Sequence, residues 1–257
     1  MLGAASAIVA YCGAPPSPAS LAGRWNLDPA LIGVLLAGLG LYLAGGRSRS
    51  RRETSAFVAG WALTTAALIS PLCALSVSLF SARVGQHMLL TLVAAPLVAL
   101  GRPLGRFGEG RALPAAIAFM ILLWLWHAPG PYAATFLSPA VYWEMHVTLF
   151  GSAVWLWSGL LAPRPPAGAI GAAALSMIQM SLIGALITLA PQPLYSPHLL
   201  TTAAWGLTPL GDQQLGGALM WAPGGLAFLA AALVIGWRFM GERRAAPPLA
   251  PGLAATR

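Results

Sequence analysis

The sequence predicts an all-α polytopic membrane protein: a bundle of seven transmembrane helices with its amino terminus outside and its carboxyl terminus inside. Three observations predict this fold: seven apolar stretches of about membrane-spanning length, a one-sided distribution of the arginines between them, and few charged residues. Hydrophobic residues make up 58% of the 257 residues and charged residues only 8%, too few to cover a soluble domain of this size.

The length of each apolar stretch defines the expected spans. A helix that rises about 1.5 Å per residue needs roughly 20 apolar residues to cross a hydrocarbon core of about 30 Å. The predicted spans lie at about Trp25–Ala44, Ala56–Leu79, Val84–Leu100, Leu113–His127, Ala140–Leu161, Ile170–Ala190 and Gln213–Trp237. Pro71 and Pro96 each remove a helical hydrogen bond, so we expect a kink or locally open backbone in the second and third spans.

The arginines set the expected orientation. If the connection Gly45–Glu53 is cytoplasmic, twelve of the fourteen arginines are cytoplasmic, and only Arg24 and Arg83 lie outside. Cytoplasmic connections are enriched in positive residues, and shifting the alternation by one span would destroy this asymmetry. The net charge of +8 therefore indicates a lipid bilayer as partner and no nucleic acid. The chain has no lysine, which excludes a retinal Schiff base.

The segments outside the spans are short. We expect residues 1–24 to form an exterior amino-terminal arm, residues 25–238 the seven-helix domain, and residues 239–257 a disordered cytoplasmic tail. The longest connection, Pro191–Asp212, carries four prolines and should fold back over the outer mouth of the bundle.

The two cysteines, Cys12 and Cys73, do not make a disulfide framework. Both lie toward the predicted outer side, where a bridge between them would be allowed. Separate packing is the interpretation that we favour.

The histidines all fall toward the predicted outer side. His87, His127 and His146 lie at similar depth on three different spans, and His198 lies in the outer connection. Ionisable groups inside a membrane are costly and usually face the bundle interior, where they mark a site or pathway. Neutral imidazole is the commonest protein ligand for transition metals. We therefore predict a metal site formed by His87, His127 and His146, while His198 is interpreted as an interfacial residue.

Two further residues are candidates for this site. Met88 follows His87 directly, and a thioether adds affinity for Cu(I), so copper is the expected metal. Asp212 opens the seventh span and would orient a histidine through a hydrogen bond. The alternative for Asp212 is to cap its own helix, since an acid in the first turn answers exposed N–H groups. Met177 and Met180 of the sixth span are interpreted as packing residues.

Several function classes remain open at this point. The sequence shows no nucleophile–base constellation, phosphate loop or zinc-protease motif, so we do not expect an enzyme. A haem protein would use two of the three level histidines as axial ligands. A transporter would use the helices that proline breaks near the middle of the membrane.

Three stretches carry a family resemblance. The run Gln86–Leu90 leading to Pro96, the segment Trp126–Pro129, and the segment Asp212–Trp221 resemble the multi-spanning CtaG family of cytochrome c oxidase assembly factors. This family is distinct from the single-span copper chaperone of the same name. The resemblance covers about residues 25–238.

The resemblance implies a multi-pass protein of the bacterial plasma (inner) membrane that acts in the biogenesis of haem–copper oxidase. It implies that the partner is the oxidase catalytic subunit and that the protein supplies copper to it. A metal-free scaffold that grips nascent oxidase helices is the alternative within the same role. Some members of the family carry a histidine four residues before the position of His87; here that residue is Arg83, so a two-histidine chelate on one helix is absent.

Overall fold

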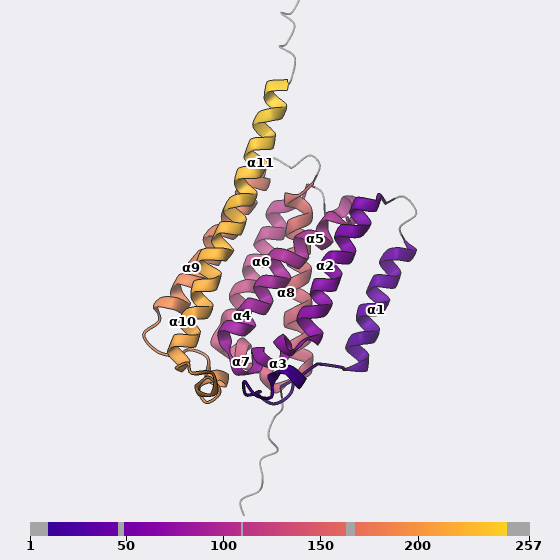
Figure 1. The fold of residues 1–257 in the computed structure, drawn as a ribbon. Coiled ribbons are helices and arrows are strands. Elements are labelled where there is room, and N and C mark those ends of the chain that lie inside the picture. Colours follow the sequence, from indigo (N-terminus) through magenta and orange to yellow (C-terminus); the bar gives the residue numbers. More distant parts are fainter. Residues whose placement is uncertain (1–9, 46–48, 109, 163–167, 246–257) are drawn as a thin grey trace, which may run out of the picture.

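The computed structural model describes residues 10–45, 49–108, 110–162 and 168–245, which form an all-α fold without strands. The long helices run side by side, and the short helices α3 (Pro71–Ser78) and α7 (Pro129–Leu137) lie at one end of the bundle (Figure 1). We call this end the α3–α7 end. The prediction of an all-α fold is confirmed for the described residues.

Helices α1 (Pro29–Ala44) and α2 (Arg51–Ile69) each begin at a side-chain cap. The carboxylate of Asp28 accepts a backbone hydrogen bond of 2.9 Å in the first turn of α1. Ser50 and Glu53 form a reciprocal capping box at the start of α2. These side chains pair N–H groups that have no partner inside the helix. The caps explain why the helices do not begin at the predicted apolar boundaries: α1 begins later than predicted, and α2 begins earlier.

The second and third predicted spans are irregular, as their prolines predict. Helix α3 bends away from α2 by 52° at the break before Pro71. Helix α4 (Phe80–Met88) passes through a π-helical segment, η2 (Leu89–Ala94), into α5 (Ala95–Leu100), whose second residue is Pro96. Proline has no N–H to donate, and a wider turn is one way for a helix to absorb it. Both predicted irregularities are confirmed.

The fourth to sixth predicted spans correspond to α6 (Ala112–His127), α8 (Pro139–Leu160) and α9 (Ala169–Leu189). The sequence did not predict α7, which bends away from α6 by 73°. Proline stands at the first position of both α7 and α8, where its missing N–H costs no helical hydrogen bond. These prolines therefore start helices at the α3–α7 end.

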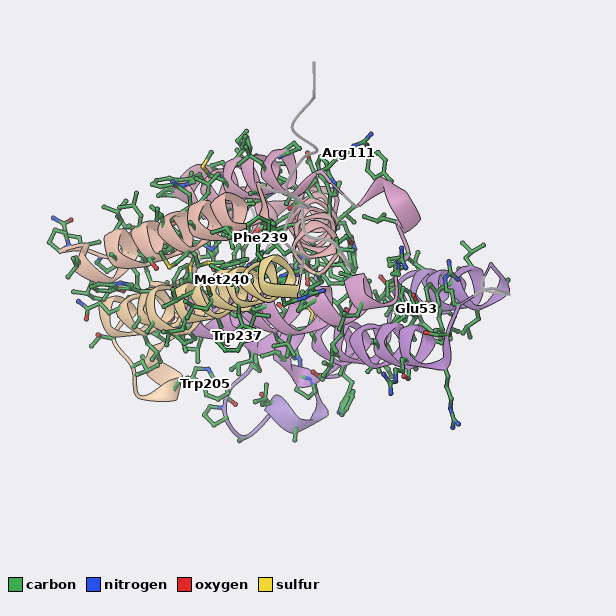
Figure 2. The ribbon with its side chains drawn as sticks, turned by 90° about the horizontal axis from the view of Figure 1, so that it is seen from above. Glu53, Arg111, Trp205, Trp237, Phe239 and Met240 are labelled. Atoms are coloured by element: carbon green, nitrogen blue, oxygen red, sulfur yellow. A yellow bond between two sulfur atoms is a disulfide. The ribbon has the colours of Figure 1, made fainter. Side chains whose placement is uncertain are left out.

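The last helix is longer than predicted. Helix α10 (Pro209–Leu219), the π-helical segment η6 (Met220–Gly224) and α11 (Gly225–Ala245) follow one another without a break, and α11 projects beyond its neighbours (Figure 1). Helix α11 thus continues into residues 239–245, which the sequence placed in a disordered tail; residues 246–257 lie outside the described residues. Trp237 and Met240 near its end are 74% and 52% exposed, a surface that lipid can cover (Figure 2).

Three described helices are long and apolar enough to cross a membrane, or up to five if each bent pair counts as one span. The three are Phe80–Leu100, Ala169–Leu189 and Pro209–Gly241, with mean hydropathies of 1.4, 1.9 and 2.0. Helix α1 is apolar but has only 16 residues. The described helices therefore show membrane spans, at a lower count than the seven predicted.

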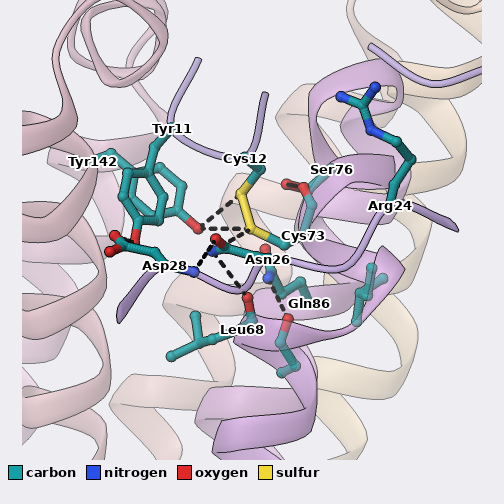
Figure 3. The surroundings of a disulfide bond; sticks show 12 residues. Tyr11, Cys12, Arg24, Asn26, Asp28, Leu68, Cys73, Ser76, Gln86 and Tyr142 are labelled. Atoms are coloured by element: carbon teal, nitrogen blue, oxygen red, sulfur yellow. Dashed lines mark hydrogen bonds between the residues drawn. A yellow bond between two sulfur atoms is a disulfide. The ribbon is translucent and has the colours of Figure 1, made fainter. Parts of the chain in front are cut away.

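The amino-terminal segment is held against the α3–α7 end by a disulfide between Cys12 and Cys73, whose Cα atoms are 5.5 Å apart (Figure 3). The expectation that these cysteines pack separately is wrong. The ring of Tyr11 stacks on the ring of Tyr142 of α8, with centroids 4.9 Å apart, so the segment next to Cys12 packs against α8 as well. Two cysteines separated by 61 residues carry no sign in the sequence that the chain returns to this point.

The connection between α9 and α10 folds back over the same end, as predicted. The Tyr195 hydroxyl donates a hydrogen bond of 2.9 Å to the carbonyl oxygen of His127. The Thr201 hydroxyl donates a hydrogen bond of 2.6 Å to the carbonyl oxygen of Ser78. The connection is thereby tied to the ends of α6 and α3, and it covers the bundle interior at this end.

Candidate functional site

Helices α4, α6 and α8 bring three histidines together inside the bundle. The ring centroid of His87 lies 5.2 Å from that of His146 and 6.5 Å from that of His127. All three side chains are buried. The rings that the sequence places at one depth therefore meet, with His87 next to both of the others.

Two of these imidazoles have a defined tautomer. Nδ1 of His127 lies 2.8 Å from the carbonyl oxygen of Leu123, and Nδ1 of His146 lies 3.0 Å from the carbonyl oxygen of Tyr142. A carbonyl oxygen can only accept, so each Nδ1 carries the proton and each Nε2 keeps its lone pair. A backbone carbonyl on the second ring nitrogen is the usual support of a metal-ligating histidine.

Two buried ring nitrogens in this cluster have no partner. Nε2 of His87 and Nε2 of His146 make no hydrogen bond in the structure. Buried polar atoms are nearly always paired, because an unpaired one loses its interaction with water without replacement. At His146, whose Nε2 keeps its lone pair, a ligand that accepts electron density would satisfy this atom.

A small cavity lies beside His87 and His127, and three methionines, Met88, Met180 and Met220, line it. The remaining lining residues are Val84, Thr91, Leu123 and Leu149. Its volume is about 10 Å³, close to the space that one water-sized guest needs. Imidazole and thioether are neutral donors, and thioether sulfur selects soft cations such as Cu(I). The cavity is therefore about ion-sized, and the residues that line it are of types whose donor atoms suit soft metals.

Gly224 makes room for two of these methionines. A Cβ atom at Gly224 would lie 2.7 Å from Cγ of Met180 and 2.9 Å from Cε of Met88. Met180, interpreted from the sequence as packing, thus reaches the same cavity as Met88, and Met220 joins it from η6. Met220 opens the π-helical segment η6, and such segments often occur at functional sites, but the π turns are seen only in the structure, and nothing in the sequence marks Met180.

Asp212 stabilises the helix that carries His87. Its carboxylate accepts hydrogen bonds of 2.6 Å and 3.2 Å from the backbone N–H groups of Phe80 and Ser81, and one of 2.5 Å from the Ser81 hydroxyl. These groups form the first turn of α4. Within the described part of the chain, its hydrogen bonds go to α4 and to no histidine, so Asp212 caps a neighbouring helix and not its own.

His198 is separate from the cavity. Its Nε2 lies 2.6 Å from the Tyr132 hydroxyl, and the side chain is 2% exposed. Burial, and next the charge of Arg83, lower the pKa of His198 to about 3. Its role in the structure is to pack the outer connection against α7.

The histidines alone are not a preformed metal centre. Across residues 10–45, 49–108, 110–162 and 168–245, no three or more His, Cys, Asp or Glu side chains are grouped so that they could hold a metal ion. His146 does not line the methionine cavity; it lines a cleft between α1 and α8 instead. Any metal in the cavity would therefore depend on sulfur as well as nitrogen donors.

Comparison with known protein families gives a match that spans most of the chain. The profile of the cytochrome c oxidase caa3 assembly factor family (Caa3_CtaG) matches residues 36–111 and 110–242. The chain belongs to this family. The matched regions of this family member contain the three histidines and all three methionines of the cavity, whereas Cys12 lies outside them. No curated protein sequence and no solved structure gives a significant match to the chain.

Proposed function

We propose that this assembly factor binds copper in the methionine cavity and passes it to the catalytic subunit of a haem–copper oxidase. The observation that carries the proposal is the cavity itself, an ion-sized space beside the imidazoles of His87 and His127 and lined by three thioethers. Neutral soft donors favour Cu(I) over hard cations such as Mg²⁺. The role is non-catalytic, in keeping with membership of an assembly-factor family.

The geometry suggests a route for the metal. His87 lines the cavity, and His146, whose ring lies 5.2 Å away, lines a cleft of about 120 Å³ that opens between α1 and α8. Both imidazoles keep an unpaired Nε2. Exchange of copper from the first imidazole to the second would move it from the bundle interior toward its surface.

Haem is a poorer fit to the same residues. A porphyrin is far larger than a cavity of about 10 Å³. The aromatic and aliphatic side chains around the histidines would have to move apart to admit it. The structure therefore favours a single ion over the haem alternative.

We infer seven spans, with the α3–α7 end outside the bacterial plasma membrane. Helix α1 has 16 residues and α8 has 22, so they rise about 24 Å and 33 Å, enough to cross most or all of a core of about 30 Å. Arg51, Arg102 and Arg111 lie at the opposite end of the bundle, at the connections α1–α2 and α5–α6. The positive-inside rule favours that end as cytoplasmic.

The test is anaerobic titration of the purified full-length protein with Cu(I) against a chromophoric chelator, together with oxidase maturation in cells. We expect one high-affinity Cu(I) site, weakened about tenfold or more by His87→Ala and by His127→Ala, the two imidazoles beside the cavity. His198→Gln is the matched control, because His198 lies outside the cavity and should leave Cu(I) affinity unchanged.

The outcomes separate the alternatives. Unchanged copper affinity and oxidase maturation after both histidine substitutions would show that the metal role is wrong. Maturation that persists without copper binding would favour a metal-free scaffold. A strong Soret band in the purified protein would favour haem, and solute flux in proteoliposomes would favour a transporter.

A further inference from the structure

Arg83 is a buried cation without a carboxylate partner. Its side chain is 2% exposed, and Nη2 donates a hydrogen bond of 2.6 Å to the hydroxyl of Thr135. Its Nε has no hydrogen-bond partner, and no Asp or Glu of the described residues forms an ion pair with it. A buried charge usually needs a counter-charge, so this guanidinium requires an explanation.

Aromatic faces hold the guanidinium in place. Its carbon lies 4.4 Å from the ring centroid of Phe136, 5.0 Å from that of Tyr132 and 5.6 Å from that of Tyr142. The negative face of an aromatic ring attracts a cation but does not neutralise it. Arginine stays protonated in proteins, so a full positive charge remains at this position.

The charge lies close to the proposed copper site. Arg83 precedes His87 by one turn of α4, so the two residues share a face of that helix. The ring of Tyr142 lies 4.2 Å from the ring of His146, so the guanidinium carbon lies within about 10 Å of that imidazole. The same guanidinium lies 3.7 Å from the sulfur of Met145, the residue before His146.

A fixed positive charge discriminates between metal ions by their charge. The bound of about 10 Å refers to the His146 ring, and we take the same distance for the cavity because His87, which lines it, is one turn from Arg83. At about 10 Å and an effective dielectric constant near 20, the arginine lowers the binding constant of a metal ion roughly tenfold for each unit of charge on the ion. For a divalent ion the binding constant is lowered by this factor twice. The neutral imidazole and thioether donors supply no negative charge to offset the repulsion. A monovalent ion is therefore favoured roughly tenfold more than it would be without the arginine.

We propose that Arg83 is a specificity-determining residue that makes the site select a monovalent soft cation, Cu(I), and reject Cu(II) and Zn(II). This inference rests on the proposed function, because it concerns the same cavity. Arg83 acts through its charge from outside the donor set. It also stands where a histidine would form an i, i+4 pair with His87, an arrangement that binds divalent metals.

The test compares the affinities of the purified full-length protein for Ag(I) and Zn(II), a monovalent and a divalent probe that undergo no redox change. Arg83→Gln and Arg83→Met remove the charge, and we expect the preference for Ag(I) over Zn(II) to fall about tenfold. Arg83→Lys keeps the charge and should keep the preference. Arg111→Gln is a matched control, because Arg111 precedes the far end of the 16-residue α6, about 24 Å from His127.

Arg83→His extends the test, because it removes the permanent charge and adds the missing i, i+4 partner of His87. We expect it to gain Zn(II) affinity beyond that of Arg83→Gln. An unchanged metal preference in folded Arg83→Gln and Arg83→Met would overturn the inference.

Failure of the inference can be told apart from failure of the proposed function. A wild-type protein that binds neither Cu(I) nor Ag(I) refutes copper binding itself. A wild-type protein that binds Ag(I), while folded Arg83→Gln, Arg83→Met and Arg83→His keep its metal preference, refutes only the role of Arg83. Thioether donors prefer Ag(I) by themselves, so the change in preference on removal of the charge decides the question.

Discussion

The carboxylate of Asp212 accepts a hydrogen bond of 2.6 Å from the backbone N–H of Phe80, although the two residues belong to helices far apart in the sequence. The contact joins the first turn of α10 to the first turn of α4 and is fully buried, with Asp212 0% exposed. A negative charge at a helix amino terminus also complements the helix dipole. Asp212 therefore helps to fix α4, and with it His87, relative to α10.

Replacing Asp212 should destabilise the protein. A hydrogen bond to a charged group contributes about 1.5–3 kcal/mol, and loss of a helix cap costs about 1 kcal/mol. We expect Asp212→Asn to cost roughly 2 kcal/mol and Asp212→Ala roughly 4 kcal/mol, measured as a lower unfolding midpoint in detergent. Glu144→Gln, which changes an exposed carboxylate on α8, is the control. A midpoint for Asp212→Ala equal to that of wild type would contradict the capping role.

The disulfide should stabilise the protein through its long loop. A cross-link between residues separated by 61 positions restricts the unfolded chain by up to roughly 4 kcal/mol in the loop-entropy description. We expect Cys12→Ser, Cys73→Ser and the double variant to lower the unfolding midpoint equally, since each removes the same bond. Reductant should lower the wild-type midpoint and leave the variants unchanged. Free thiols in the unreduced, unfolded wild-type protein would count against the bond.

His198 should make stability fall in acid. Its pKa is lowered to about 3 in the folded protein by burial, from an ordinary value of about 6.5. Between about pH 6.5 and pH 3, His198 is protonated in the unfolded chain but stays neutral in the folded chain. Folding stability then drops by up to about 1.4 kcal/mol per pH unit. His198→Gln should make the unfolding midpoint depend less on pH, as measured at pH 7, 5 and 4. If the midpoints of the wild type and the variant fall in parallel, this role of His198 is disproved.

The thioethers of Met180 and Met220 should contribute to metal binding more than to folding. Leucine has nearly the volume of methionine, so such a swap in a core usually costs less than about 1.5 kcal/mol. We expect Met180→Leu and Met220→Leu each to weaken Cu(I) binding about tenfold in the chelator competition. Met177→Leu is the control, because Met177 packs against the core but does not line the cavity. Equal Cu(I) affinities in all three variants would show that the thioethers of Met180 and Met220 are not ligands.

Gly224 should be required for the position of these sulfurs. Gly224→Ala adds a Cβ atom within 3 Å of Met180 and Met88, so both side chains must shift. We expect weaker Cu(I) binding, with only a small change in the unfolding midpoint, since both methionines are flexible. Gly236→Ala on α11 is the matched control, because nothing lies within 4 Å of its added Cβ. A weaker site in both variants would point to a general helix effect.

Much of the fold could be predicted from the sequence because its signals are local. The apolar stretches predicted the approximate positions of most helices. Pro71 and Pro96 correctly predicted a helix bend and a π-helical segment, respectively. A constant rise per residue was enough to place His87, His127 and His146 at one depth. The predicted boundaries failed where caps and prolines act, as at α1, α7 and α10, because a hydrogen-bonding side chain or a proline starts these helices.

The residue pattern was enough to predict the helical class, the approximate depths of the histidines and the neutral character of the proposed metal donors. Three features became visible only in the folded chain: Met180 and Met220 line the same cavity as His87, Cys12 bonds to Cys73, and Asp212 caps α4. The physical reason is that the apolar helices of this bundle are hydrophobic on nearly every side, so their hydrophobic pattern does not show which face points inward. Helix rotation and the return of distant segments are set by packing, which a linear pattern does not record.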